Sequence, residues 1–93
     1  MFVHLTIHRP RTGKEQLVID SMHRFGEAMT GLPGLQQVYE LRDQKTGALI
    51  ALSIWDGEED WRAARPTMLE AVKGDNLDEW EERPPEVYHL EVV

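Results

Sequence analysis

The sequence predicts an α+β fold of the ferredoxin-like type, in which one antiparallel sheet carries two helices in the order βαββαβ. Three observations predict it. Apolar and polar residues alternate with period two in residues 2–8, three further short segments read as strands, and two longer segments repeat apolar residues every three to four positions. Gly, Pro and charged turn residues separate these segments. The 93 residues are expected to form a single domain, residues 1–93.

The first half of the chain predicts a strand followed by a helix. Residues 2–8 alternate between apolar and polar side chains, as in a strand. A helical stripe of apolar residues follows between Lys14 and Met29. We expect this helix to end near Gly31, because glycine adopts the left-handed cap conformation and Pro33 prevents continuation.

The middle of the chain predicts a hairpin. Residues 35–41 and 48–55 have the composition of strands, and the polar loop between them ends in Gly47. Five residues rich in carboxylates, 56–60, come next, and carboxylates favour the positive end of a helix dipole. A second helix should therefore begin there.

The second helix is expected to be irregular and to be followed by the last strand. Pro66 lacks an amide donor, so the helix should kink or restart there before it ends at Gly74. Residues 75–82 predict a short helical turn, and residues 87–93 predict the closing strand. Two strand–helix–strand halves in this order place both helices on one face of the sheet.

Both faces of the predicted sheet are apolar. We expect one set to pack under the helices: Val3, Leu5, Ile7, Ile50, Leu52, Ile54, Leu90 and Val92. The other face would then display Phe2, His4, Thr6, His8, Tyr39, Leu41, Leu49, Ala51, Ser53, Trp55, Val87, His89 and Val93. A contiguous patch of this kind indicates an interaction surface, so we expect a homodimer that joins the sheet faces of two copies.

Composition narrows the classes of function. The net charge of −7 argues against nucleic-acid binding, which needs a basic surface. No apolar run is long enough for a membrane span and the first residues do not resemble a signal peptide, so we expect a cytoplasmic protein with no membrane partner. The absence of cysteine excludes thiolate nucleophiles, disulfides and Cys-ligated metals. There is no Gly-rich phosphate loop, serine nucleophile elbow or His-Glu-x-x-His motif.

Three histidines on the first and last strands are the first candidates for chemistry. The first and last strands are neighbours in this topology, so His4 and His89 are expected to lie close together, with His8 on the same face. An imidazole can deprotonate a phenol or enol near neutral pH. Alternatively, these side chains hydrogen-bond in or across a dimer interface, stay in solvent, or form a His-His-Glu metal site with Glu91.

Tryptophan, arginine and tyrosine side chains are candidates for holding a ligand. Trp55 and Trp61 flank the junction of the third strand and second helix, where they would form either the walls of an aromatic pocket or ordinary core. Arg65 would hold an oxyanion if it points inward, or pair with Asp60 or Glu58 if it points outward. Tyr39 and Tyr88 are candidate hydrogen-bond donors or plain strand residues, and Trp80 is expected to cover the sheet edge.

Several local features resemble the antibiotic-biosynthesis-monooxygenase (ABM) group of dimeric α+β barrels. Leu32-Pro33-Gly34-Leu35 is similar to the group's turn into the second strand. The segment from Ser53 to Trp61 resembles its Trp-acidic junction, and the segment from Pro84 to Val93 resembles its closing strand. The likeness covers essentially the whole chain. It implies a dimer and, among known members, cofactor-independent monooxygenases of aromatic substrates, haem-degrading enzymes and proteins without an assigned reaction.

The residues of this sequence show whether it fits the haem-degrading branch of the group. Those members combine an Asn on the first strand with a Trp and an iron-binding His on the second helix. This chain has Trp61, but it has no Asn before Asn76 and no His between His23 and His89. The resemblance therefore implies no haem here, and we expect no cofactor at all.

Three functions stay open from the sequence. The first is a cofactor-independent monooxygenase of a small aromatic or quinol-type molecule, with His4 or His89 as proton acceptor, Arg65 beside them and Trp55 and Trp61 as pocket walls. The second is a non-catalytic dimeric module that binds a small molecule or a partner protein. The third is proton transfer without oxygen, as in an isomerase or decarboxylase, by the same groups. Fold alone does not separate them.

Overall fold

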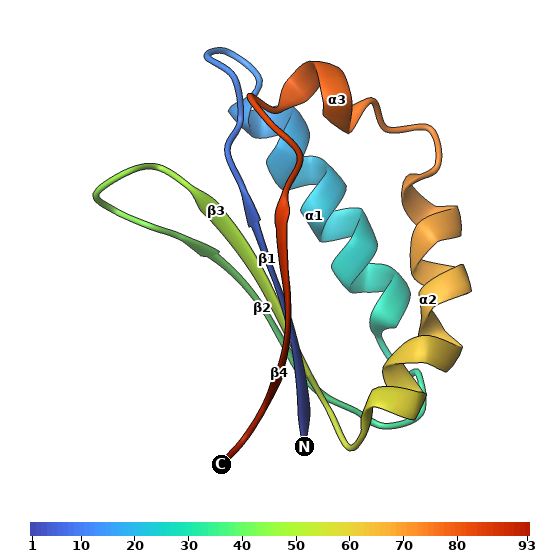
Figure 1. Ribbon diagram of the computed structural model, residues 1–93. Coiled ribbons are helices and arrows are strands. Elements are labelled where there is room, and N and C mark those ends of the chain that lie inside the picture. Colours follow the sequence, from blue (N-terminus) through green and yellow to red (C-terminus); the bar gives the residue numbers. More distant parts are fainter.

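The computed structural model describes all 93 residues and has the predicted βαββαβ architecture, with both long helices on one face of a four-stranded antiparallel sheet (Figure 1). The elements are β1 (Phe2–His8), α1 (Glu15–Met29), β2 (Leu35–Arg42), β3 (Leu49–Trp55), α2 (Glu58–Val72), the short α3 (Leu77–Trp80) and β4 (Glu86–Glu91). The strands are ordered β2-β3-β1-β4. The α+β fold class and the order of elements predicted from the sequence are confirmed.

The register of the sheet decides which side chains share a face. In antiparallel pairs, residues directly opposite each other project to the same side. His4 lies opposite Ser53 on one neighbour and opposite His89 on the other, so the expected proximity of the two histidines is confirmed. Phe2 and Trp55 are likewise opposite each other. These residues all face the helices.

The face assignment expected from the sequence is wrong for β1, β3 and β4, whose two faces are exchanged, and it is right for Tyr39 and Leu41 of β2, which lie on the uncovered side. The side under the helices carries Phe2, His4, Thr6, His8, Leu49, Ala51, Ser53 and Trp55, which form the core or line a cavity there. The uncovered side carries Val3, Leu5, Ile7, Tyr39, Leu41, Ile50, Leu52, Ile54, Tyr88 and Leu90. Residues 49–55 are apolar at nearly every position, so alternation does not distinguish the two faces. The large rings of Phe2 and Trp55, which pack with Trp61 of α2, decide the orientation.

The core under the helices is divided into two clusters. The larger one contains Phe2, Met29, Trp55, Trp61, Ala64 and Met68. The smaller one contains Val18, Met22 and Leu49, near the other end of the sheet. Because α1 runs antiparallel to β1, its last turn reaches the first cluster and its first turns reach the second. The space between the clusters is where a cavity can form.

The turn before β2 needs glycine. Gly34 has a φ of 83°, a left-handed conformation that side chains rarely adopt, and a Cβ there would lie 2.3 Å from the Asp60 side chain on α2. Its carbonyl accepts a hydrogen bond of 2.8 Å from the amide of Asp56. The Pro-Gly turn thereby fixes the start of β2 against the junction of β3 and α2.

The second helix continues through Pro66, so of the two expected outcomes, a kink or a restart, the restart does not occur. Pro66 leaves the carbonyl of Arg62, one turn earlier, without its usual donor, but Arg62 is exposed, and water can satisfy that carbonyl. Beyond α2, Asp75 accepts hydrogen bonds from Ser21 (2.6 Å) and Arg24 (2.7 Å) of α1. These bonds attach the α2–α3 link to α1.

No helix combines the length and the apolar run that crossing a bilayer requires.

Candidate functional site

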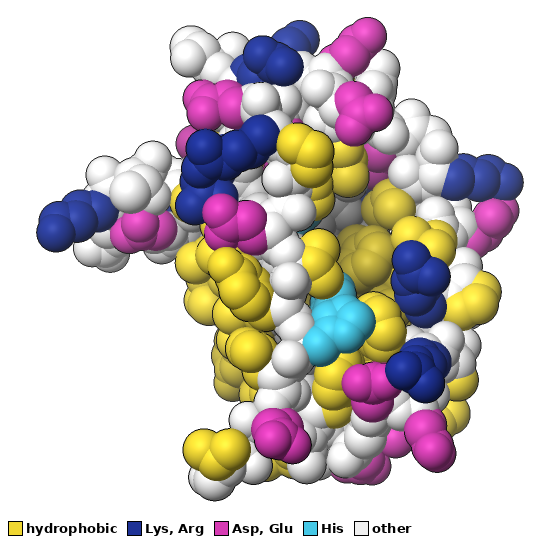
Figure 2. Space-filling view, in the orientation of Figure 1, with side chains coloured by type: hydrophobic (Ala, Val, Ile, Leu, Met, Phe, Trp, Pro, Cys, Tyr) yellow, Lys and Arg dark blue, Asp and Glu magenta, His cyan; other side chains and the backbone are white.

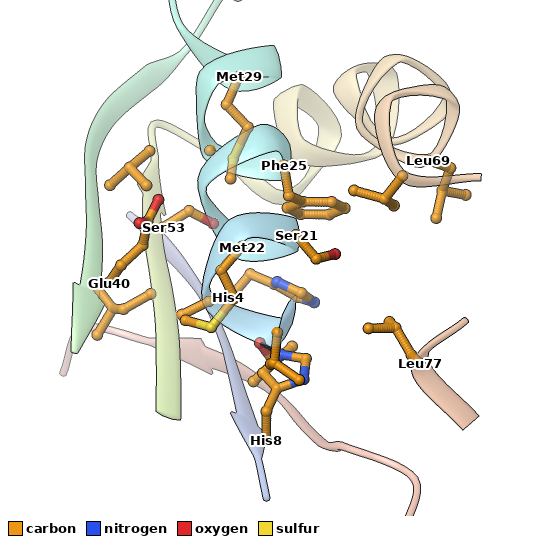
Figure 3. A pocket seen from close by; sticks show the side chains of 17 residues that line it. His4, His8, Ser21, Met22, Phe25, Met29, Glu40, Ser53, Leu69 and Leu77 are labelled. Atoms are coloured by element: carbon orange, nitrogen blue, oxygen red, sulfur yellow. Dashed lines mark hydrogen bonds between the residues drawn. The ribbon is translucent and has the colours of Figure 1, made fainter. Parts of the chain in front are cut away.

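A cavity of about 190 Å³ lies between the sheet and the helices (Figure 3). Ten of the 17 residues that line it are hydrophobic, so the space suits an apolar ligand. Its polar members come from the sheet and from α1: His4, Thr6, His8, Ser21, Glu40 and Ser53. Phe25 of α1 and Leu69 of α2 approach each other across it, while His8 and Leu77 lie at one end and Met29 at the other (Figure 3).

The cavity reaches the surface between the helical layer and the sheet. Figure 2 shows a hollow lined by hydrophobic side chains, with a histidine at its rim and cationic and acidic side chains beyond. Leu69, which lines the cavity, has 46% of its surface exposed, so the cavity opens to solvent beside α2. A small molecule can therefore enter without unfolding of the core.

Four aromatic rings gather beside the cavity. His4 stacks on Trp61, with ring centroids 4.7 Å apart and planes 28° apart. His89 lies 4.8 Å from Trp61 and 5.3 Å from His4, and Phe2 completes the group at 5.6 Å from Trp61. The Trp61 indole N–H is buried and has no hydrogen-bond partner. An orphaned buried donor of this kind is uncommon in folded proteins.

His4 is held as a neutral imidazole at physiological pH. Burial lowers the pKa of His4 from 6.5 to about 4, with further lowering by the charges of His89 and Arg65. Its nitrogen lone pair is thus available to accept a hydrogen bond from a ligand. An imidazole with so low a pKa is a weak base, since general bases work best when their pKa lies near the working pH.

A second polar group occupies the end of the cavity near α3. The hydroxyl oxygen of Thr6 lies 2.9 Å from Nε2 of His8, and Nδ1 of His8 lies 3.0 Å from both carboxylate oxygens of Glu81. Glu81 follows α3 directly and is only 2% exposed. It reaches β1 because Pro10 and Glu81 form a bridge, next to a bond from the amide of Glu82 to the carbonyl of Arg9.

A carboxylate enters the cavity wall from β2. Glu40 pairs with His23 of α1 at 2.8 Å and fills the space that a side chain on Gly26 would occupy. A Cβ on Gly26 would lie 2.5 Å from one carboxylate oxygen of Glu40. Glycine at this helical position therefore makes room for the carboxylate.

The structure brings together some of the predicted site residues and separates others. His4, His89 and Trp61 form one cluster, but of the three only His4 lines the cavity, and Trp61 belongs to the core. Trp55 is fully buried in the core and donates its indole hydrogen to Ser53 at 2.9 Å, so it is not a wall of the cavity. Arg65 is exposed and pairs with neither Asp60 nor Glu58, and Glu58 pairs with Arg62.

Tyr39 and Tyr88 lie on the uncovered face of the sheet, opposite the cavity. They are 47% and 43% exposed. The register places Tyr39 beside Leu52 and Tyr88 beside Leu5, in one row across the sheet. They do not reach a ligand in the cavity of their own subunit.

Sequence reasoning missed Thr6, Glu81 and Glu40 as parts of the site. The Thr6–His8 contact carries a local signal, because residues two apart on a strand share a face. Glu81 gave none. It is one of several carboxylates around α3, and only the path of the chain selects it as the partner of His8.

The arrangement does not favour a bound metal or a porphyrin. No three His, Asp or Glu side chains group together in a way that could hold a metal ion, so the alternative of a site from His4, His89 and Glu91 is not supported. A cavity of about 150 Å³ accommodates one benzene ring. The 190 Å³ here therefore fits a ligand of one ring or slightly more and not a porphyrin, and α2 offers no histidine as an iron ligand.

The chain matches no protein-family model and no curated protein. It does match solved structures over nearly its full length. Rv0793 from Mycobacterium tuberculosis superposes with a TM-score of 0.86 at 14% identity, over 99% of this chain and 94% of that one. A protein described as an antibiotic biosynthesis monooxygenase superposes with a TM-score of 0.81 at 12% identity, over 100% and 99%.

A mutant of MhuD with two manganese protoporphyrin IX groups bound per active site also shares the fold. Its TM-score is 0.79 at 16% identity, over 100% of this chain and 95% of that one. The resemblance to the ABM group is thus confirmed at the level of the fold. Identities this low establish no activity, substrate or catalytic residue for this chain.

Proposed function

We propose that this protein is a cofactor-independent monooxygenase of a small aromatic or quinol-type molecule. The observation that carries the proposal is the neutral imidazole of His4, stacked on Trp61 and next to His89, in the wall of an apolar cavity of one-ring size. The shared fold with a structure described as an antibiotic biosynthesis monooxygenase supports it.

The proposed reaction needs only a substrate that can become electron-rich. His4 accepts a hydrogen bond from its acidic hydroxyl or enol at the cavity wall, and His89, whose ring lies 5.3 Å from that of His4, accepts the proton. The resulting anion gives electrons to dioxygen directly. For a substrate CH2 group, one oxygen atom replaces the two hydrogens to form a carbonyl, and the other oxygen leaves with them as water. Atoms and electrons balance without an external reductant.

Two neighbouring groups would assist this step. Trp61 belongs to the core and does not line the cavity, but its ring stacks on His4 and holds that imidazole at the cavity wall. Arg65 adds positive charge near His4 and would stabilise a developing anion. The apolar lining excludes water, which strengthens both interactions.

We also propose that the working form is a homodimer joined through the uncovered face of the sheet. That face exposes Tyr39, Leu41, Tyr88 and Leu90 by 42–47% each, beside the partly exposed aliphatic residues of β1 and β3. An apolar patch of this kind marks an interface, and a symmetric dimer covers it with the same patch of a second copy. Tyr39 and Tyr88 would then act in dimerisation.

The monooxygenase proposal is tested by oxygen uptake with purified protein. Hydroxylated compounds of one or two rings should support uptake, and larger fused-ring compounds should not enter the cavity. His4→Gln, His89→Gln and Trp61→Phe should each lower uptake. The matched control is His23→Gln, which removes an exposed histidine that does not line the cavity. Equal uptake in the His4→Gln, His89→Gln double variant would remove this pair from the mechanism.

A second candidate function is a non-catalytic small-molecule carrier. The predominance of hydrophobic residues in the cavity lining favours it, because such a lining binds apolar ligands without chemistry. The two functions differ in a simple measurement. A carrier returns the bound compound unchanged and consumes no oxygen, whereas turnover that is retained without oxygen would indicate the isomerase-type or decarboxylase-type alternative.

A further inference from the structure

The cavity contains a hydroxyl–imidazole–carboxylate chain at its α3 end, formed by Thr6, His8 and Glu81. We propose that this chain is a second acid–base centre, which takes the proton of a phenolic or enolic hydroxyl on a one-ring ligand. Thr6 contacts the ligand, His8 holds the proton and Glu81 positions and charge-compensates the imidazole. The inference rests on the proposed function only in that the cavity receives a small hydroxylated aromatic molecule.

The hydrogen bonds orient the chain toward the cavity. A carboxylate only accepts hydrogen bonds, so Nδ1 of His8 must carry the proton that it shares with Glu81. In neutral His8 the lone pair is then on Nε2, which faces the Thr6 hydroxyl at 2.9 Å. Thr6 donates to that lone pair, and its own oxygen is left free to accept a hydrogen bond. Carboxylates that orient serine-activating imidazoles act by the same principle.

Burial explains why this chain is suited to hold a proton. Glu81 is 2% exposed, and its only hydrogen-bonded side-chain partner is His8. A buried carboxylate is unfavourable unless a positive charge or several donors compensate it. When His8 gains a proton, an imidazolium lies 3.0 Å from both carboxylate oxygens. The pair then carries no net charge.

The second centre is separate from the ring cluster of His4, Trp61 and His89. His4 and His8 are four residues apart on one strand, which places their Cα atoms about 13 Å apart. Thr6 lies between them and projects to the same face, and all three line the cavity. A ligand ring in the cavity can thus present one group to His4 and a hydroxyl to Thr6.

The proposed step is a balanced proton transfer. The O–H bond of the ligand breaks, and its proton moves to Oγ1 of Thr6 as the Thr6 proton moves to Nε2 of His8. The electron pair stays on the ligand oxygen. The products are the ligand anion, a neutral Thr6 hydroxyl and an imidazolium paired with Glu81, and no oxidant or reductant takes part.

The experiment is an anaerobic absorbance titration with 4-nitrophenol, whose anion is yellow and whose neutral form is colourless. The pH is set where most of the free probe is neutral. We expect the wild-type protein to bind the probe as its anion. Binding is followed independently by the change in tryptophan fluorescence. A bound probe that stays neutral, or a probe that does not bind at all, would overturn the proposal.

Two pairs of variants test the role of the Thr6–His8–Glu81 chain. His8→Gln and Glu81→Gln should each lower the ratio of bound anion to neutral probe by about tenfold or more, the effect of one pKa unit. Since both side chains are buried and these variants can fail to fold, Thr6→Val and Thr6→Ser provide the second test. Thr6→Val keeps the shape of the side chain and leaves the His8–Glu81 contact in place, so it should abolish the anion signal, whereas Thr6→Ser should retain it.

The same titration distinguishes this inference from the proposed function. His4→Gln should weaken binding of the probe, but the probe that does bind should still be the anion. If His4→Gln abolishes the signal while Thr6→Val retains it, the proton goes to the His4 cluster and the second centre is disproved, although the monooxygenase proposal stands. If the anion signal follows Thr6 and His8 but no compound supports oxygen uptake, the second centre stands and the monooxygenase proposal fails.

Discussion

The imidazole of His4 stacks on the indole of Trp61, with ring centroids 4.7 Å apart and planes 28° apart. The contact joins the central strand β1 to the first turn of α2. It buries His4 deeply enough to keep it neutral and places that neutral ring beside a cavity. One packing contact thus contributes both to the core and to the candidate site.

The neutral state of His4 predicts a pH-dependent stability. The unfolded chain binds a proton at His4 with a pKa near 6.5, and the folded chain does so only at about 4. As the pH falls from 6.5 toward 4, the unfolded state binds a proton at His4 and the folded state does not, so the free energy of unfolding decreases. The loss is on the order of 2 kcal/mol after allowance for solvent screening. Urea unfolding at a series of pH values measures it.

His4→Phe is the informative variant for this prediction. It retains an aromatic ring against Trp61 but cannot titrate. Its stability should vary less between pH 6.5 and 4 than that of the wild type. An unchanged pH dependence in His4→Phe would show that His4 is not the group responsible.

The hydrogen bond from Trp55 to Ser53 predicts an energetic coupling in the core. Ser53→Ala removes the acceptor and leaves the indole N–H of a fully buried tryptophan without a partner. We expect a loss of about 1–3 kcal/mol in the free energy of unfolding. In a Trp55→Phe background, which has no donor, the same substitution should cost much less. A double-mutant cycle measured by urea unfolding tests this, and additive effects would contradict it.

The close approach of Gly26 to Glu40 predicts that the effect of Gly26→Ala on stability depends on whether Glu40 is present. A Cβ at position 26 would lie 2.5 Å from a Glu40 carboxylate oxygen, so Gly26→Ala must displace that side chain and its pairing with His23. In the wild type, this displacement should offset the gain in helix propensity. In a Glu40→Ala background, Gly26→Ala should stabilise the protein by about 0.5–1 kcal/mol. Thermal unfolding of the four variants measures the difference, and equal effects in both backgrounds would disprove the steric explanation.

The uncovered sheet face predicts a dimer that one substitution can disrupt. Sedimentation at micromolar concentration should give twice the chain mass of 10.8 kDa for the wild type. Leu5→Glu places a charge in the middle row of that face, between Leu52 and Tyr88, and should shift the protein to the monomer. The control is Leu17→Glu, an exposed position on α1 outside the sheet. A monomeric wild type would contradict the proposed dimer.

Much of the architecture follows from local features of the sequence. The strand at residues 2–8 was predicted from its alternation, and the ends of the two long helices were predicted to within a few residues from Gly31 and the acidic run 56–60. The proximity of His4 and His89 followed from topology alone. Each of these features depends on near neighbours in the sequence or on the few connections allowed between strands.

Two kinds of information required the tertiary structure. The first is which face of the sheet the helices cover, because residues 49–55 offer apolar side chains to both sides and only the packing of Phe2 and Trp55 with Trp61 decides. The second is the partner of His8, since Glu81 lies 73 positions away among several carboxylates. The sequence by itself therefore determined the order and type of the elements through local periodicity. Contacts between distant segments, which depend on shape and burial in three dimensions, determined the cavity and the chemistry that it can support.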